Sequence, residues 1–130
     1  MIAVDTNVLV RLLANDDDVQ SPRAAQLFAS EDVFIAKSVL LETEWVLRFS
    51  YGLSRSNISA AFNKLLSAAS VTIEDAGATR TAVDAHAAGM DFADALHVAS
   101  AAHSARFVTF DKKLARQAGR AKIGRPVATI

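Results

Sequence analysis

Two aspartates stand directly after short apolar runs, where a carboxylate is well placed to bind a metal or a phosphate ester. Asp5 follows Ile2-Ala3-Val4, and Asp111 follows the run from Phe107 to Phe110. Such runs are typical of strands buried on both faces, and ligands of open α/β sheets bind beyond the carboxyl ends of the strands. Aspartate is also a favoured helix N-cap, so both residues are equally open to a structural interpretation.

Glu42 is a third candidate, because it falls within a helix predicted from Val39 to about Tyr51. Its neighbours at three and four residues include Trp45 and Val46, which places it on a largely apolar stripe. An unpaired charge is costly there, so we expect a partner or a metal. The structural alternative is a carboxylate that reaches water at the edge of the stripe.

Glu44 is the alternative to Glu42. It precedes Arg48 by four residues, and a pair at this spacing is typical of a solvated helix face. We therefore predict Glu44 on the surface, Glu42 at the site and Trp45 in the core.

Asp91 and Asp94 lie three residues apart at the start of a helix predicted over 92–104. We interpret Asp91 as the N-cap, and an acid in the first turn is favoured by the helix dipole. Asp94 has apolar neighbours on both sides. We expect it along the seam between this helix and the sheet, which can open onto the same end as Asp5.

Other kinds of catalytic site are poorly supported. The chain has no cysteine, no glycine-rich phosphate loop and no nucleophile elbow. Three histidines lack the spacing of zinc ligands and are predicted at the surface or at edges, namely His86, His97 and His103.

Short strands and helical segments alternate along the chain and must position the acids. Strands are predicted at 2–4, 33–36, 71–73, 107–110 and 127–130. Helices are predicted at 7–14, 22–29, 39–51, 56–69, 79–88, 92–104 and 112–118, with Ser21, Ser38 and Asp91 as N-caps and Gly52, Gly89 and Gly119 as ends. This order predicts one α/β domain over 1–130, a three-layer α/β/α arrangement around a mainly parallel sheet of four to five short strands.

Composition sets the remaining limits. The chain has 130 residues, 52% of them hydrophobic, which fits a single domain with a substantial core. Fourteen basic and fourteen acidic residues cancel, so a protein that coats nucleic acid is not indicated. The lack of cysteine, of a signal peptide and of a membrane-length apolar stretch leads us to expect a cytoplasmic protein.

Four segments, taken in order in a chain of this length, resemble a PIN domain, in particular the VapC-type toxin of bacterial toxin–antitoxin pairs. No one of them is specific alone, and together they span nearly the whole chain. They are Val4-Asp5-Thr6-Asn7, the run from Val39 to Leu47, the run from Asp91 to His97, and Val108-Thr109-Phe110-Asp111.

This resemblance implies a Mg²⁺- or Mn²⁺-dependent endoribonuclease that hydrolyses RNA. It implies that the acidic, metal-binding site consists of Asp5, Glu42, Asp94 and Asp111, with Thr6 or Asn7 in support. Asp111 is the position whose role varies most across such domains. The resemblance also implies a homodimer and an antitoxin whose tail enters the acidic groove.

The chemistry suits these residues. Mg²⁺ prefers oxygen ligands and keeps several waters, so a few carboxylates suffice, and either one or two ions fit the pattern. Four cationic side chains near the expected rim are candidates for contacts to RNA phosphates or are solvated surface charges, namely Arg11, Lys37, Lys112 and Lys113.

Three alternatives remain. A phosphatase of the haloacid-dehalogenase type also begins with an aspartate after its first strand, but its second acid falls where this chain has Asn7. A receiver-like signalling domain has paired acids before the first strand end, which this chain lacks. A non-catalytic PIN fold retained for binding is disfavoured by the four acids.

Overall fold

A computed structural model describes all residues from 1 to 130, in two compact units, Met1–Ala76 and Gly77–Ile130. The elements follow one another in the predicted order, β-α-α-β-α-α-β-α-α-β-α-β. All strand pairs are parallel, and they form a three-stranded and a two-stranded sheet. The predicted α/β class with parallel strands is therefore confirmed.

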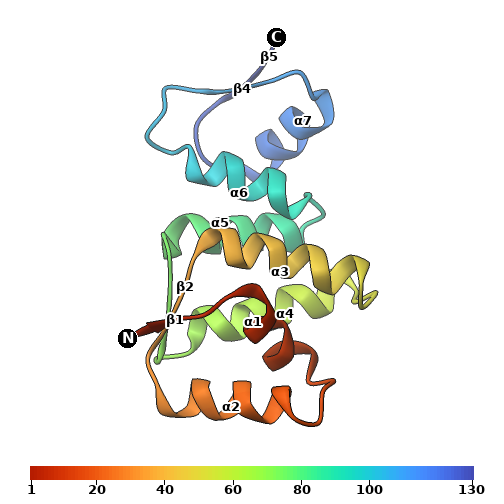
Figure 1. The fold of residues 1–130 in the computed structure, drawn as a ribbon. Helices are drawn as coiled ribbons and strands as arrows, with labels where there is room; N and C mark the ends of the chain where they lie inside the picture. The colour runs from red at the N-terminus through yellow and green to blue at the C-terminus, as the bar shows by residue number, and fades with distance from the viewer. The chain divides into compact units, whose positions relative to one another are not determined.

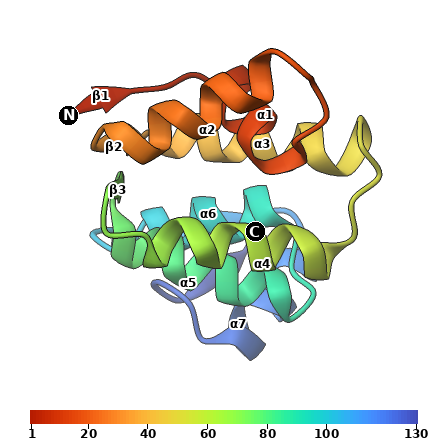
Figure 2. The same cartoon turned by 90° about the horizontal axis from the view of Figure 1, so that it is seen from below.

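The first unit consists of a small parallel sheet and four helices (Figure 1). Its strands lie side by side in the order β1-β2-β3 at one edge of the unit (Figure 2). The strands are β1 (Ile2–Ala3), β2 (Val33–Ile35) and β3 (Val71–Ile73), and the helices are α1 (Thr6–Ala14), α2 (Gln20–Ser30), α3 (Lys37–Phe49) and α4 (Arg55–Ser67).

Apolar residues at helical spacing direct α1 and α3 into one core. Leu9 of α1 and both Leu40 and Leu47 of α3 are completely buried, as are Val33 and Ile35 of the central strand. Helix α1 packs against both α2 and α3. Because β1 and β2 are parallel neighbours, the helices that follow them begin at the same edge of the sheet. This is how the start of α1 comes to lie near α3.

The second unit pairs two strands and packs helices on them. It contains α5 (Ala76–Ala87, which begins one residue earlier), α6 (Phe92–Ser100), β4 (Phe107–Thr109), α7 (Lys112–Ala121) and β5 (Val127–Thr129). Residue Phe107 is in register with Val127, and α7 packs against β4, β5 and α6. The connection from β4 through α7 to β5 therefore places Asp111 at the carboxyl end of β4.

Three predicted helix starts are wrong, those of α2, α3 and α5, and the last begins at Ala76 rather than at Thr79. Helix α2 begins at Gln20, before Ser21, because Asp17 Oδ1 accepts the N–H groups of Val19 and Gln20 at 2.9 and 2.6 Å. The buried Ser21 hydroxyl instead accepts the Asp17 N–H. Both capping bonds come from a residue upstream of the predicted cap.

Helix α3 begins at Lys37, so Ser38 is not its N-cap. The Lys37 N–H donates to Glu74 Oε1 at 2.8 Å, which satisfies an N-terminal donor from a distant part of the chain. Two predicted ends also move: α6 ends at Ser100, and α7 continues through Gly119 to Ala121, where Lys122 takes the left-handed conformation with φ 54°.

The prediction that His86 lies at the surface or at an edge is wrong. His86 is only 3% exposed, and its ring meets the Phe92 ring edge-on at 5.6 Å. It is a core residue, because the imidazole packs as an aromatic. His97 and His103 are exposed, as predicted. None of the helices is long and apolar enough to cross a membrane.

Candidate active site

Asp5 serves as the N-cap of α1 and still presents a carboxylate oxygen. Its backbone is extended, and its Oδ1 accepts the Val8 N–H at 3.1 Å. The other oxygen has no hydrogen-bond partner in the protein, and the residue is exposed. The capping and the metal-binding interpretations are therefore compatible, since each requires only one oxygen.

Glu42 is held next to this cap by a side-chain hydrogen bond. The hydroxyl of Thr6, the first residue of α1, donates to Glu42 Oε1 on α3. Glu42 is exposed, so its carboxylate is accessible to a ligand. Thr6 therefore has a supporting role, because its hydrogen bond orients the Glu42 side chain toward the start of α1.

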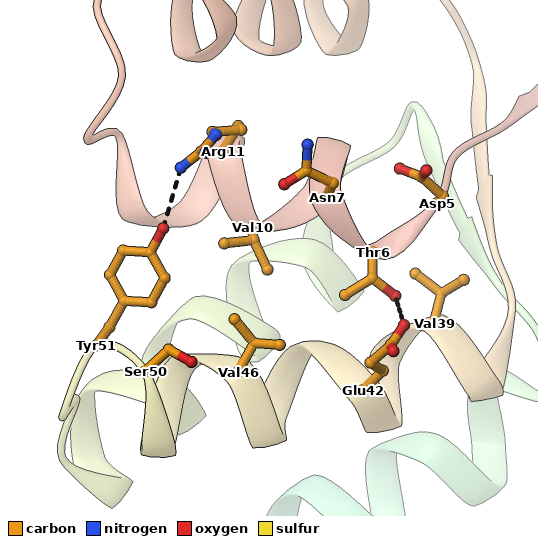
Figure 3. Close-up of a pocket in the computed structure, with 10 residues that line it drawn as sticks. All are labelled: Asp5, Thr6, Asn7, Val10, Arg11, Val39, Glu42, Val46, Ser50 and Tyr51. Atoms are coloured by element: carbon orange, nitrogen blue, oxygen red, sulfur yellow. Dashed lines mark hydrogen bonds between the residues drawn. The ribbon is translucent and has the colours of Figure 1, made fainter.

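The acids line one end of a groove of about 630 Å³ formed by α1 and α3. Figure 3 shows Asp5, Thr6 and Glu42 at that end, with Val10 and Val46 beyond them and Arg11 and Tyr51 at the other end. Asn7, Val39 and Ser50 complete the lining. The first unit thus brings together four of the six predicted site residues, namely Asp5, Thr6, Asn7 and Glu42.

The surroundings of Glu44 and Trp45 were predicted wrongly. Glu44 is 2% exposed, and Arg48 donates to it through Nε at 2.8 Å and Nη2 at 3.2 Å. Trp45 is 54% exposed and packs against Phe49. The spacing between Glu44 and Arg48 correctly predicted an ion pair, but it did not predict that Glu44 is buried. Glu44 is consequently an ion-paired residue of the core, whereas Glu42 lines the groove.

Two aspartates of the second unit cap helices. Asp91 Oδ2 accepts the Asp94 N–H at 3.0 Å at the start of α6, which confirms the predicted cap. Asp111 Oδ1 accepts the N–H groups of Lys113 and Leu114 at 2.9 and 3.1 Å at the start of α7. Asp111 is exposed and its Oδ2 has no hydrogen bond, so one of its oxygens is accessible to a ligand.

Asp94 carries an unfavourable negative charge. Burial raises the pKa of its carboxyl, and the charges of Asp91 and Asp111 raise it further, while His97 opposes them. These acids therefore lie within electrostatic range of one another in the second unit. Burial and these like charges together make the charged form of Asp94 costly in the absence of a cation.

Removing the Asp94 charge should stabilise the metal-free protein. Since the pKa is raised in the folded state, the folded protein holds its proton more tightly than the unfolded chain does, and stability falls as pH rises through that pKa. We expect Asp94→Asn in EDTA at pH 7 to melt at or above the parent's temperature. The difference should disappear below the ordinary aspartate pKa, at about pH 3. A clear loss of stability at pH 7 would show that Asp94 is mainly structural.

The donor atoms fit a hard divalent cation. They are carboxylate, hydroxyl and amide oxygens without cysteine, and Mg²⁺ and Mn²⁺ prefer such ligands. Within either unit, no group of three or more acids or histidines has the geometry to hold a metal. Each unit thus offers part of an oxygen ligand set: Asp5 and Glu42 in the first, Asp94 and Asp111 in the second.

A polar network around Arg11 was not predicted from the sequence. Its guanidinium bonds to Gln20, Asp16 and the Tyr51 hydroxyl, at distances from 2.8 to 3.3 Å. Arg11 was expected near the rim of the site without any specified partner, and Tyr51 was expected only as the end of a helix. Tyr51 is 40 positions away, so no local spacing could have indicated the contact.

The chain was compared with known proteins and protein families. A search of curated proteins found no significant match. The family model described as PIN domain matches residues 2–120, which includes all four predicted acids and both supporting residues. The match covers most of both units, and the chain therefore belongs to the PIN domain family.

Proposed function

We propose that this PIN domain is an endoribonuclease that hydrolyses RNA with the help of bound Mg²⁺ or Mn²⁺. PIN domains are generally nucleases, they generally use divalent metals, and their substrates are nucleic acids. The observation that carries the proposal is the family match over residues 2–120, because Asp5, Glu42, Asp94 and Asp111 all fall within it.

In this proposal the four carboxylates bind the metal together. Asp5 and Asp111 each use one oxygen as a helix cap, and the other oxygen is accessible to a cation. Thr6 holds Glu42 in place by its hydrogen bond. The raised pKa of Asp94 supports its inclusion, because burial first and then the charges of Asp91 and Asp111 disfavour its carboxylate, and a cation beside it would offset both effects.

Hydrolysis of a phosphodiester requires a water oxygen to bond to phosphorus while the bond to the leaving sugar oxygen breaks and that oxygen takes a proton. A bound divalent cation supplies charge stabilisation at the phosphate and lowers the pKa of a coordinated water. In this proposal the chain's carboxylates would hold the cation, and Asn7, which lines the same groove as Asp5, would help to hold Asp5 or a metal-bound water. Either one or two ions are compatible with four carboxylates.

The assay that tests this function is incubation of the purified protein with total cellular RNA, with Mg²⁺ or with EDTA, followed by mapping of new ends. We expect new internal ends only with the metal. A generic phosphomonoester is assayed in parallel, because phosphate release from it without RNA cleavage would indicate the phosphatase alternative. Intact RNA in the presence of metal-bound, folded protein would contradict the proposal.

We further propose that the protein is the toxin of a type II toxin–antitoxin pair. This rests on the VapC-like resemblance of the four segments rather than on the chemistry of the site. We also expect a homodimer and a cognate antitoxin whose tail enters the acidic groove. We expect a cytoplasmic location, which suits a chain without cysteine.

Expression of the chain in bacteria should slow growth, and co-expression of the small protein encoded beside it should restore growth. The reason is that uncontrolled cleavage of cellular RNA arrests translation. The control is Asp5→Asn at the same expression level, which should be harmless. Dimerisation is measured by light scattering. Normal growth with abundant active nuclease would contradict the toxin assignment and leave the nuclease assignment intact.

A further inference from the structure

The groove of the first unit is chemically different at its two ends. Asp5 and Glu42 occupy one end, and Arg11 and Tyr51 occupy the other (Figure 3). Val10 and Val46 lie between them and give the groove an apolar middle. The acids belong to the proposed metal site. The Arg11 end has no part in holding a metal, because arginine has no free lone pair to offer.

Arg11 is held in a fixed orientation by its partners. Its Nε donates to Gln20 Oε1 at 2.8 Å, and its Nη1 donates to the Tyr51 hydroxyl at 3.1 Å and to Asp16 at 3.1 and 3.3 Å. Nη2 has no partner in the protein, and no unpaired polar atom is buried. The guanidinium therefore presents an accessible donor whose direction is set in advance, which is the arrangement that recognises a phosphate or a base edge.

The Arg11 guanidinium lies too far along the groove from the two acids to contact the same nucleotide as they do. From Glu42 to Ser50 the helical rise along α3 is about 12 Å. One nucleotide occupies roughly 3.4 Å along a stacked strand. If the scissile phosphate of an RNA strand lies beside Asp5 and Glu42, a different nucleotide of that RNA would therefore contact Arg11. Its ribose and base would cross the valines, and the Tyr51 ring would be available for stacking.

We infer that the Arg11–Tyr51 end of the groove is a second subsite that binds a neighbouring nucleotide of single-stranded RNA. The inference rests on the proposed nuclease function and adds the residues that contact the nucleotide next to the cleavage site. An apolar floor and a phenol ring favour unpaired bases, because the bases of a duplex are already stacked on one another and hidden from the protein. A base-paired substrate would reach the groove only through its backbone.

Asp16 provides an independent way to test the subsite. Its carboxylate pairs with Arg11 and offsets much of the positive charge that would attract RNA. Asparagine at this position retains an oxygen that can accept the Arg11 hydrogen bond but removes the negative charge. Asp16→Asn should therefore bind RNA more tightly than the parent, a gain that general damage to the fold would not produce.

The experiment measures the anisotropy of a fluorescein-labelled, mixed-sequence single-stranded RNA of about ten nucleotides. It is done in EDTA at low ionic strength, so that neither metal binding nor cleavage contributes. Relative to the parent, we expect about tenfold weaker binding for Arg11→Gln, a smaller loss for Tyr51→Phe, and binding about two- to fivefold tighter for Asp16→Asn. Lys64→Gln removes an exposed positive charge from α4 outside the groove and should stay within about twofold.

Two further results decide the inference. The same RNA annealed to its complement should bind the parent more weakly. Equal binding of both forms, no measurable binding by the parent, or Arg11→Gln and Lys64→Gln with the same affinity would overturn the subsite. The cleavage of total RNA by the parent is measured separately. If the parent is active and Arg11→Gln binds RNA as tightly as the parent, only the subsite is contradicted. If the parent is inactive, the proposed function is contradicted.

Discussion

Replacement of Asp5 or Asp94 by asparagine should reduce metal-dependent RNA cleavage by at least about 100-fold while leaving the protein folded. An asparagine keeps the size of either side chain. At position 5 it also keeps most of the capping ability, and the cap of α6 is Asp91, which is unchanged, so helices α1 and α6 should still form. What each change removes is a negative charge that we propose binds the cation. Initial rates on a labelled RNA substrate over a range of Mg²⁺ concentrations provide the measurement.

Matched controls separate charge from position. Asp18→Asn removes an exposed acid from the loop before α2, outside the groove, and should leave the rate unchanged. Glu42→Gln should be nearly as damaging as Asp5→Asn, although the Thr6 hydroxyl can still donate to the amide oxygen. Parental activity in Asp5→Asn or Asp94→Asn would contradict the ligand assignment.

Replacement of Arg48 by alanine should lower the free energy of unfolding by about 3 kcal/mol. Glu44 is 2% exposed, and Arg48 is its only hydrogen-bond partner, with bonds of 2.8 and 3.2 Å. Without the guanidinium, a carboxylate would remain buried and unpaired, which is more costly than the loss of the ion pair itself. The contact of Arg48 with the Phe49 ring, 4.4 Å from the centroid, would be lost as well.

Urea denaturation of the parent and the variant measures this difference. Arg116→Ala, an exposed arginine of α7 without a salt bridge, is the control and should change stability by less than about 0.5 kcal/mol. Adding Glu44→Gln to Arg48→Ala should recover part of the loss, because the buried charge is then gone. If Arg48→Ala were as stable as Arg116→Ala, Glu44 would not depend on its partner for burial.

The acids that stand at element boundaries were predictable from the sequence. Asp5 and Asp111 each follow an apolar run, and Asp91 precedes a helical pattern, and all three are N-caps in the structure. These are local signals, since a strand end and a capping bond each involve only a few consecutive residues. The element order was predictable for the same reason.

Features that depend on tertiary packing were not predictable. The pair of Glu44 and Arg48 has the spacing of a surface ion pair, and only packing against the rest of the chain buries the glutamate. Trp45, the next residue of the same helix, is 54% exposed. The start of α3 depends on Glu74, 37 positions away, and the Arg11–Tyr51 bond spans 40 positions. No helix or strand periodicity encodes such contacts.

The most direct test of the proposed metal site is calorimetric titration of Mn²⁺ into the parent, Asp5→Asn and Asp94→Asn. Asp5 belongs to the first unit and Asp94 to the second, and each has partners only within its own unit in the contacts described above. If the four carboxylates hold the metal jointly, each single change should abolish or strongly weaken Mn²⁺ binding. Retention of parental Mn²⁺ affinity in either variant would contradict a joint site and would remove that aspartate from the proposed set of ligands.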